Sequence, residues 1–304
     1  MFCWKLSEYN MNIFMRAIGF SQYETKKKLN ELADYIKKNA RIISSIPLKQ
    51  DEYAREYIIN ITESIGCILH TTVTDEGEYD DYIYPFSKGT LTQCVAGVSM
   101  ERKLGQECYL GACDDGKSGM NLIFFVMNSQ ECINQAEHDY ASGRLPVNVH
   151  LSALSVDAKI LLPLDRSGNM RQKQVVAKEK KRQMLEAASK GDVQAMQILS
   201  ISQMDELNNA YQRIGREDLF SVVDTTFMPY GLECDRYAIV GDIKEVEKIT
   251  NPLTEENIHK LTVECNELTI EVCINEKDLF GEPQVGRRLK GSIWMQGEIG
   301  FLLS

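Results

Sequence analysis

The sequence predicts an α+β protein with a mainly antiparallel N-terminal part, a short helical hairpin and a C-terminal β part. An amphipathic helical stripe lies near the start of the chain, and runs of β-branched and aromatic residues separated by turn residues dominate the rest. Between these β-rich parts lie two helical patterns that meet at Gly191 and Asp192, the sequence of a helical hairpin. With 304 residues, 43% hydrophobic and 26% charged, the chain is long enough for two globular domains.

Two helices are expected first. Gly19 follows an apolar segment at residues 12–20 and suits the left-handed turn that closes a short helix. Ser21 and Glu24 have the spacing of a capping box, in which the serine hydroxyl accepts a bond from a helix amide. We therefore expect a helix from Ser21 to about residue 41, whose apolar face is formed by Leu29, Leu32, Ala33, Ile36 and Ala40.

A β-rich stretch follows. Residues 67–73 and 80–86 predict a hairpin, because Asp75-Glu76-Gly77 between them is a turn sequence. The tip holds five carboxylates in seven residues, and we interpret it as a solvated turn because the run is too short for a calcium loop. Four further elements are predicted: strands at residues 57–61, 107–112 and 121–128, and a helix at 129–142, before one or two strands at 147–164.

The division of the chain is predicted from its polar segments. Residues 165–174 are polar and form the best linker, and helices at 178–190, from Asp192 onwards and at 204–214 make a helical insert. The predicted units are therefore an α+β domain at residues 11–165, the linker with its hairpin at 166–216 and a C-terminal β domain at 217–304.

The C-terminal domain is expected to be a small OB-like β-barrel or a half-open β-sandwich. The elements behind this expectation are extended segments at residues 220–225 and 235–249, a hairpin of 259–265 and 268–275 around Asn266-Glu267, a helical turn at 276–280 and a strand at 287–295. Pro252 ends the second of these segments, because proline cannot donate to a sheet.

Charge and hydropathy exclude several classes of protein. The net charge of −10 repels nucleic acid and anionic membranes. The longest apolar run, Leu122–Met127, is far shorter than the ~20 residues of a membrane span, and the N-terminus lacks a signal-peptide core. One stretch is basic, in contrast to the rest of the chain: between Arg171 and Lys190 there are seven basic and two acidic residues. This stretch is either a solvated helix face or a contact for a polyanion, although it lacks aromatic residues that would stack on bases.

The cysteine and histidine pattern predicts no metal and no cofactor. Nine scattered cysteines in a long chain indicate reduced thiols and a cytoplasmic location rather than a disulfide framework. No CxxC pair occurs, and no two of the four histidines are close enough in sequence to form a helical pair.

The best catalytic candidates are Cys113, Asp114 and Asp115, since the sequence has no P-loop, GxGxxG, HExxH or GxSxG motif. Adjacent carboxylates could share a proton, and Cys113 could act as a nucleophile if His138 or His150 folded beside it. The alternative is a turn whose aspartates bond to nearby backbone amides.

The candidate binding residues lie on the last predicted strand, which is basic within an acidic neighbourhood. Residues 231–282 hold thirteen acidic and five basic residues, whereas the next residues bring cations and an aromatic ring: Arg287, Arg288, Lys290, Trp294 and Gln296. These side chains either pair internally with Glu264, Glu271 or Glu282 while Trp294 fills the core, or bind a ligand as OB folds do, or contact a protein partner.

Four sequence blocks carry a resemblance to a known family. They are FMRAIGF at residues 14–20, CDD followed by SG at 113–119, SVVDTTFMPYGLECD at 221–235 and DLFGEPQVGRRLKGSIWMQG at 278–297. With these blocks the chain resembles an uncharacterised family of clostridial bacterial proteins, a domain of unknown function. Because members of that family start just before the first block, we expect residues 1–10 to be an N-terminal extension or Met11 to be the start. The resemblance implies no catalytic residue, substrate or cofactor.

The sequence as a whole favours a cytoplasmic, non-enzymatic binding or scaffold protein that recognises a protein partner through its C-terminal β domain. One alternative is a hydrolase or transferase centred on Cys113 and Asp114. A second is polyanion binding between Arg171 and Lys190.

Overall fold

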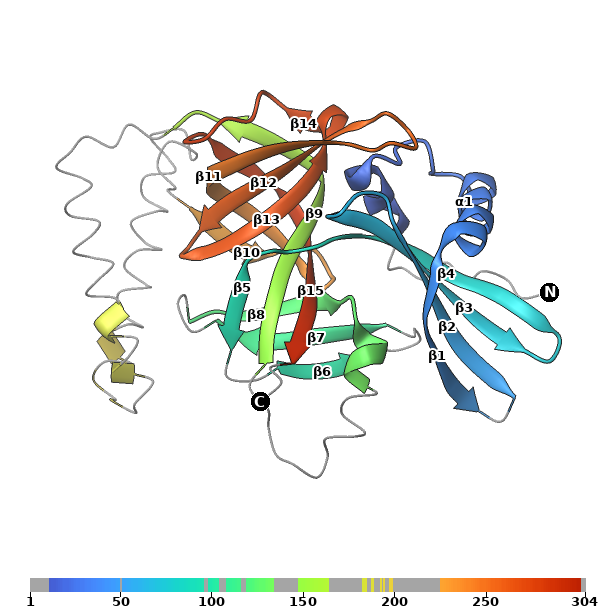
Figure 1. Cartoon of the computed structure of the whole chain (residues 1–304). Helices are drawn as coiled ribbons and strands as arrows, with labels where there is room; N and C mark the ends of the chain where they lie inside the picture. The colour runs from blue at the N-terminus through green and yellow to red at the C-terminus, as the bar shows by residue number, and fades with distance from the viewer. Residues whose placement is uncertain are drawn as a thin grey trace.

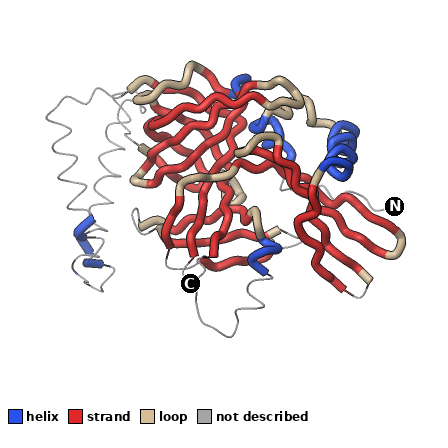
Figure 2. The backbone as a smooth tube through the Cα atoms, viewed as in Figure 1, coloured by secondary structure: helices blue, strands red, loops and turns tan. Residues whose placement is uncertain are grey.

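Strands make up most of the described residues in this computed structural model, and helices are few among them (Figure 1, Figure 2). The α+β class is thereby confirmed. The structure describes residues 11–49, 51–95, 98–103, 108–115, 119–133, 147–163 and 225–301, with a few residues between 182 and 198. Within these ranges, no helix is long and apolar enough to cross a bilayer.

The N-terminal helices form, but the second one begins later than predicted. A 3-10 helix, η1 (Met11–Ile18), ends at Gly19, whose φ of 88° is the expected left-handed turn. The helix α1 (Lys26–Asn39) is capped by Thr25, whose hydroxyl accepts a bond from the backbone N–H of Lys28. The predicted capping box at Ser21 is therefore wrong, because the Ser21 hydroxyl bonds instead to Glu256, far along the chain.

A four-stranded antiparallel sheet follows α1, in the order β1-β2-β3-β4 (Figure 1). The predicted hairpin is confirmed and forms strands β3 and β4. The first strand, β1, was not predicted from the sequence and lies at the opposite edge of the sheet from β4. The strands are β1 (Arg41–Lys49), β2 (Glu52–Asn60), β3 (Ile65–Thr74) and β4 (Gly77–Ser87).

The other strands belong to a second, larger sheet. The predicted strand at residues 147–164 is one long strand, and the last strand runs well beyond residue 295. The members are β5 (Thr92–Val95), β6 (Val98–Arg102), β7 (Tyr109–Asp114), β8 (Asn121–Val126), β9 (Val147–Leu161), β10 (Thr226–Pro229), β11 (Arg236–Thr250), β12 (Asn257–Cys265), β13 (Leu268–Asn275), β14 (Leu279–Phe280) and β15 (Arg288–Phe301).

Five of these strands pair in a closed circuit, which we call the ring: β11, β12, β13, β9 and β15. The strand β11 pairs with both β12 and β15, β12 pairs with β13, and β9 joins β13 to β15. Only the β13–β9 pairing is parallel. The long antiparallel pairing of β9 with β15 is visible where the two strands run side by side in Figure 1.

Two turns predicted for the C-terminal part are confirmed, whereas the extended segment predicted at residues 220–225 lies almost wholly outside the described residues. Asn266 and Glu267 join β12 to β13 with φ angles of 49° and 69°, as a tight two-residue hairpin turn requires. The strand β11 ends at Thr250, directly before Asn251 and Pro252. A short 3-10 helix, η2 (Glu276–Asp278), precedes β14.

Most of the predicted linker and helical insert lies outside the described residues. At Asp192 the predicted helix cap is present, since its carboxylate accepts a bond of 2.9 Å from the backbone N–H of Gln194. The division of the chain into domains at residues 165 and 217 stays a prediction, although β9 pairs with β13 and β15 from beyond those boundaries.

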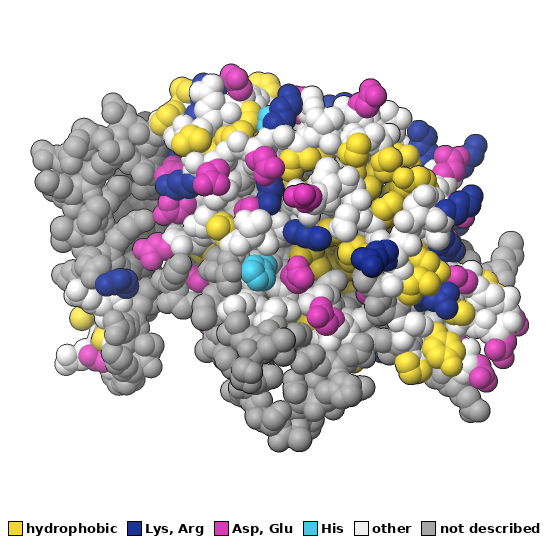
Figure 3. Space-filling model, viewed as in Figure 1, with side chains coloured by type: hydrophobic (Ala, Val, Ile, Leu, Met, Phe, Trp, Pro, Cys, Tyr) yellow, Lys and Arg dark blue, Asp and Glu magenta, His cyan; other side chains and the backbone are white. Residues whose placement is uncertain are grey.

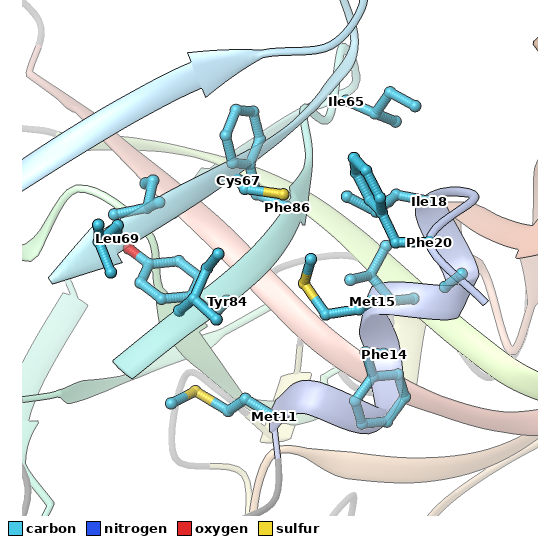
Figure 4. Packing of buried hydrophobic residues seen from close by; sticks show 14 of the residues in the cluster. Met11, Phe14, Met15, Ile18, Phe20, Ile65, Cys67, Leu69, Tyr84 and Phe86 are labelled. Carbon is cyan, nitrogen blue, oxygen red and sulfur yellow. The ribbon is translucent and has the colours of Figure 1, made fainter. Parts of the chain in front are cut away.

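The molecule has two hydrophobic cores. One lies among the strands of the larger sheet and includes Ile239, Val263, Ile270, Leu289 and Met295. The other lies where η1 and α1 meet the four-stranded sheet and the ring, and Figure 4 shows side chains of η1, such as Met15 and Ile18, beside those of β3 and β4. The helix η1 is therefore held between the two sheets.

Polar contacts fix the C-terminal end of η1 to the ring. Its last carbonyl groups lack helical partners, and side chains from the ring and its loops supply the donors. Asn275 donates to the Arg16 carbonyl at 3.0 Å, Asn251 to the Ile18 carbonyl at 2.9 Å, and Thr254 to the Gly19 carbonyl at 2.6 Å. Each contact joins residues more than 230 positions apart, so η1 is an integral part of the ring's surroundings.

The Arg16 side chain adds a bidentate ion pair. Its Nε lies 2.7 Å and its Nη2 2.5 Å from the two carboxylate oxygens of Asp278. A parallel fork of this kind is a strong, directional contact.

Replacing Gly19 with alanine is expected to destabilise the protein more than replacing Gly231. Both glycines have positive φ, 88° and 78°, which cost an L-residue roughly 1–2 kcal/mol. A Cβ at Gly19 would also lie 2.8 Å from Cβ of Asn251, whereas one at Gly231 meets nothing within 4 Å. Thermal and urea unfolding of the two variants measures the difference, and equal losses would contradict the close packing of η1 on Asn251.

Candidate functional site

The predicted catalytic residues lie at the end of a strand and in a turn. Cys113, on β7, is 3% exposed and pairs with Val98 and Leu122 in the neighbouring strands. Burial, with smaller contributions from Asp115 and Asp114, raises the pKa of the Cys113 thiol to about 12. At neutral pH this thiol is protonated, whereas a nucleophilic cysteine needs a lowered pKa.

Neither proposed histidine partner is seen beside this cysteine. His138 lies outside the described residues, and His150 pairs with Thr92 and Glu298 on other strands. The Asp114 carboxylate accepts a bond of 3.0 Å from the Asn121 side chain, and the backbone of Asp115 closes a turn with Met120 and Gly119. The Asp114 carboxylate thus bonds to a side-chain amide rather than to the backbone amides of the predicted turn, and both the turn and the catalytic interpretation of these residues stay predictions.

Cys113 is expected to resist alkylation under conditions in which Cys234 reacts. Cys234 is exposed, whereas Cys113 is buried with a raised pKa. Labelling of the native protein at pH 7.5 with iodoacetamide, followed by mass spectrometry, compares the two thiols within one sample. Labelling of Cys113 as fast as Cys234 would restore the enzyme hypothesis.

Three of the five predicted binding residues are buried. Trp294 is 0% exposed, packs against the rings of Phe14 and Phe125, and donates from Nε1 to Asp235 at 2.8 Å. Gln296 is also 0% exposed and bonds to the backbone of Pro85 and Ser87 at the end of β4. Both side chains join β15 to the rest of the core, so neither meets solvent.

The arginines are held by backbone carbonyl groups. Arg288 is 4% exposed and donates from Nε to the Leu162 carbonyl at 3.1 Å. Arg287 lies at the surface and donates to the Glu282 carbonyl at 3.0 Å. Two glutamates expected to pair with these arginines contact lysines: Glu264 pairs with Lys244, and Glu271 with Lys260.

The structure brings together a polar cluster that sequence reasoning missed, which we call the His70 cluster: Glu56, His70, Asp81, Tyr82 and Gln130. Cross-strand register aligns the first, second and fourth of these residues across β2, β3 and β4. The His70 ring lies flat on the Tyr82 ring, with centroids 4.8 Å apart and an angle of 7°. Its Nδ1 lies 3.2 Å from the Asp81 carboxylate and its Nε2 3.4 Å from Nε2 of Gln130.

A β-bulge places Asp81 against His70. The register of β3 and β4 shifts between His70 and Thr71, which leaves Asp81 as the extra residue of β4. The Thr72 hydroxyl donates to the same carboxylate at 2.7 Å and holds it in position. The turn at Asp75-Glu76-Gly77 pairs Thr74 with Gly77 and, counted outwards, sets His70 opposite Asp81, so the hairpin register was the signal that could have found this pair.

The His70 cluster orients an imidazole but closes it off from solvent. His70, Glu56 and Gln130 are 2%, 4% and 6% exposed. Burial, with smaller contributions from Tyr84 and Cys108, raises the pKa of Tyr82 well above its usual range, so its hydroxyl stays protonated. The cluster therefore joins the four-stranded sheet to the short helix at residues 129–133 by polar contacts, and the His70 imidazole is enclosed.

A row of side chains crosses three strands at the start of β15, and we call it the Phe280 row: Phe280 and Lys159, which are exposed, and Lys290, which is half-buried. Phe280 on β14 lies opposite Lys159 on β9, and Lys159 lies opposite Lys290 on β15. Phe280 is 80% exposed. Of the predicted binding residues, Lys290 belongs to this row and Arg287 lies near its end.

The candidate groups in the described residues differ in how accessible they are. No group of three or more His, Cys, Asp or Glu that could hold a metal ion occurs in this part of the chain. The candidate thiol is protonated and the oriented histidine is enclosed, whereas Phe280 is exposed.

Comparison with known proteins defines a family and no more. Residues 15–297 match the family model described as a domain of unknown function, E. rectale gene description (DUF3881). The chain belongs to this family, as its four sequence blocks indicated. The comparisons with curated proteins and with solved structures gave no match.

Proposed function

We propose that the protein is a non-enzymatic binding protein and that the ring is an OB-like barrel whose outer surface recognises a partner protein. The closed circuit of pairings supports the barrel, because an OB fold is a five-stranded Greek-key barrel. The seven described cysteines are free thiols, which supports a reducing, cytoplasmic setting.

The observation that carries the proposal is the exposure of Phe280 beside two lysines. Single exposed apolar residues are ordinary, but Phe280 lies directly opposite Lys159, which in turn faces Lys290. Aromatic and arginine side chains are the commonest anchors of protein interfaces. The enzyme alternative at Cys113 and Asp114 finds no support in the protonated thiol and the turn around it.

Polyanion binding remains a separate prediction. The stretch between Arg171 and Lys190 lies almost entirely outside the described residues. Retention on heparin that weakens steeply with salt would support it.

The proposed function is tested by capture of partners with the immobilised protein and two matched variants. The variant Arg287→Ala/Lys290→Ala changes the ring surface, and Lys27→Ala/Arg41→Ala removes the same charge from exposed positions elsewhere. We expect proteins retained by the wild type and by the control variant to be lost by the ring variant, as quantified by mass spectrometry. Equal retention by both variants, or no specific retention by the wild type, would refute binding through the ring.

A further inference from the structure

Three large apolar side chains stand exposed in the turn between β10 and β11. Met228, Tyr230 and Leu232 are 55%, 54% and 100% exposed. A single exposed apolar residue is ordinary, but several together mark a surface that another molecule covers. We call these residues, with Pro229 and Gly231 between them, the 228–232 turn.

Backbone hydrogen bonds on either side hold the 228–232 turn in place. The N–H of Tyr230 donates to the Arg236 carbonyl at 2.8 Å, which closes the turn on itself. The N–H of Met295 on β15 donates to the Asp235 carbonyl at 2.9 Å and fixes the start of β11. The turn is therefore ordered before it meets a partner, and an ordered surface loses less conformational entropy on binding.

The turn is uncharged in an acidic chain. Residues 225–232 contain no Asp, Glu, Lys or Arg, whereas the whole chain has a net charge of −10. The two acidic residues that follow are neutralised or buried, since Glu233 forms an ion pair with Lys103 and Asp235 is 0% exposed. The turn therefore has no charge with which to attract a nucleic acid or a charged peptide.

A second copy of the chain fits such a surface. In a dimer with two-fold symmetry, the commonest oligomer, a patch meets the same patch of the other copy, so any charge on it faces a like charge. The acidic surface of this chain therefore repels itself, whereas the uncharged 228–232 turn does not. Methionine and tyrosine, which supply two of its three exposed side chains, are also enriched at protein interfaces.

The strand β10 adds an edge that two copies can share. It lies at the end of the larger sheet and pairs with β11 alone among the described strands. An edge strand presents backbone groups that can pair with another chain. Phe227 packs into the core at 9% exposure, so by strand alternation Met228 points to the opposite face, where a second copy can reach it.

We propose that two copies of the protein associate through the 228–232 turn and the edge of β10, with the two Leu232 side chains in contact. This inference goes beyond the proposed function and uses a different surface. Three strands of the ring, β11, β15 and β9, separate β10 from the strand β14 that holds Phe280.

The mass of the full-length protein in solution tests the proposal. We expect sedimentation equilibrium to give the mass of two chains at concentrations up to about 100 µM. Leu232→Asp should raise the dissociation constant by about tenfold or more, because each copy then brings a carboxylate into an apolar contact. Val285→Asp adds the same charge at another exposed apolar position, 67% exposed, and should dimerise as the wild type does.

A pair of oppositely charged variants separates loss of the contact from loss of folding. Leu232→Asp and Leu232→Lys should each be monomeric, and their equimolar mixture should form a heterodimer because opposite charges then face each other. The exposed Cys234 reports on the same contact. A bismaleimide crosslinker should join the Cys234 thiols of two wild-type chains, and Leu232→Asp should abolish this crosslink.

A wild type that is monomeric at about 100 µM would overturn the inference. A dimer that Leu232→Asp leaves as stable as before would overturn it too, because the two copies would then meet elsewhere. Neither result affects partner capture that depends on Arg287 and Lys290, so the proposed function and this inference can fail separately.

Discussion

Replacing Glu271 with glutamine is expected to lower the free energy of unfolding by about 3–5 kcal/mol at neutral pH. The side chains of Lys260 and Glu271 are only 6% and 8% exposed, and their charged atoms lie 2.8 Å apart. Glutamine keeps the shape and an acceptor for the Thr90 hydroxyl, but it leaves the Lys260 ammonium buried without a negative partner. Urea unfolding of the variant and the wild type measures the loss.

The double variant Lys260→Met/Glu271→Gln is the control for this prediction. Methionine removes the buried charge at similar length, so the double variant should be more stable than Glu271→Gln alone. A double variant as unstable as the sum of the two single changes would show that the ion pair is not what holds this region together.

The lowered pKa of Glu271 predicts that the protein loses stability in acid. Burial alone would raise the pKa of Glu271, but hydrogen bonds from Lys260 and Thr90 lower it below its ordinary 4.5. Because the folded-state pKa is the lower one, this contribution is complete above about pH 4.5 and disappears as the pH falls through the folded-state value. Glu271→Gln should therefore lose less stability than the wild type over that acidic range.

Replacing Trp294 with alanine is expected to cost about 3–5 kcal/mol of stability, the range observed when large aromatic side chains are deleted from cores. Its ring centroid lies 5.1 Å from that of Phe14 and 5.2 Å from that of Phe125, so the deletion leaves a cavity between η1, β8 and β15. Trp294→Phe should cost about 1–3 kcal/mol, since it keeps a ring but removes a donor from the buried Asp235.

Phe280→Ala is the matched control on the same sheet. Its side chain is 80% exposed, so the change should alter stability by no more than about 0.5 kcal/mol. Chemical unfolding of the three variants distinguishes a core residue from a surface one. If Trp294→Ala left the stability unchanged but weakened partner binding, Trp294 would belong to the recognition surface rather than to the core.

Elements that depend on residues close together in the sequence could be predicted. The hairpin of β3 and β4, the turn at Asn266-Glu267 and the left-handed Gly19 follow from turn chemistry and from residues with a preference for strands. The edge strand β1 was missed, since no element was predicted between the end of the helix at about residue 41 and the strand at residues 57–61.

What depends on contacts between distant segments could not be predicted. Ser21 has the spacing of a helix cap, but Glu256 from the far end of the chain takes its hydroxyl. Trp294 stands among cations in the sequence, yet η1 covers the outer side of its strand and encloses it. The hairpin register, counted from its turn, sets His70 near Asp81, but the bulge that pairs His70 with Tyr82 instead could not be predicted.

The long separation between contacting segments has a consequence for how the protein is made. Arg16 and Asp278 are 262 positions apart, and β9 needs both β13 and β15 to complete its pairings. Contacts of such high sequence separation slow folding, because the ends of a long loop must first meet. During translation η1 and β9 therefore emerge well before their partners and keep apolar surface uncovered until the final strand has left the ribosome, an interval in which chaperones have a binding site to protect.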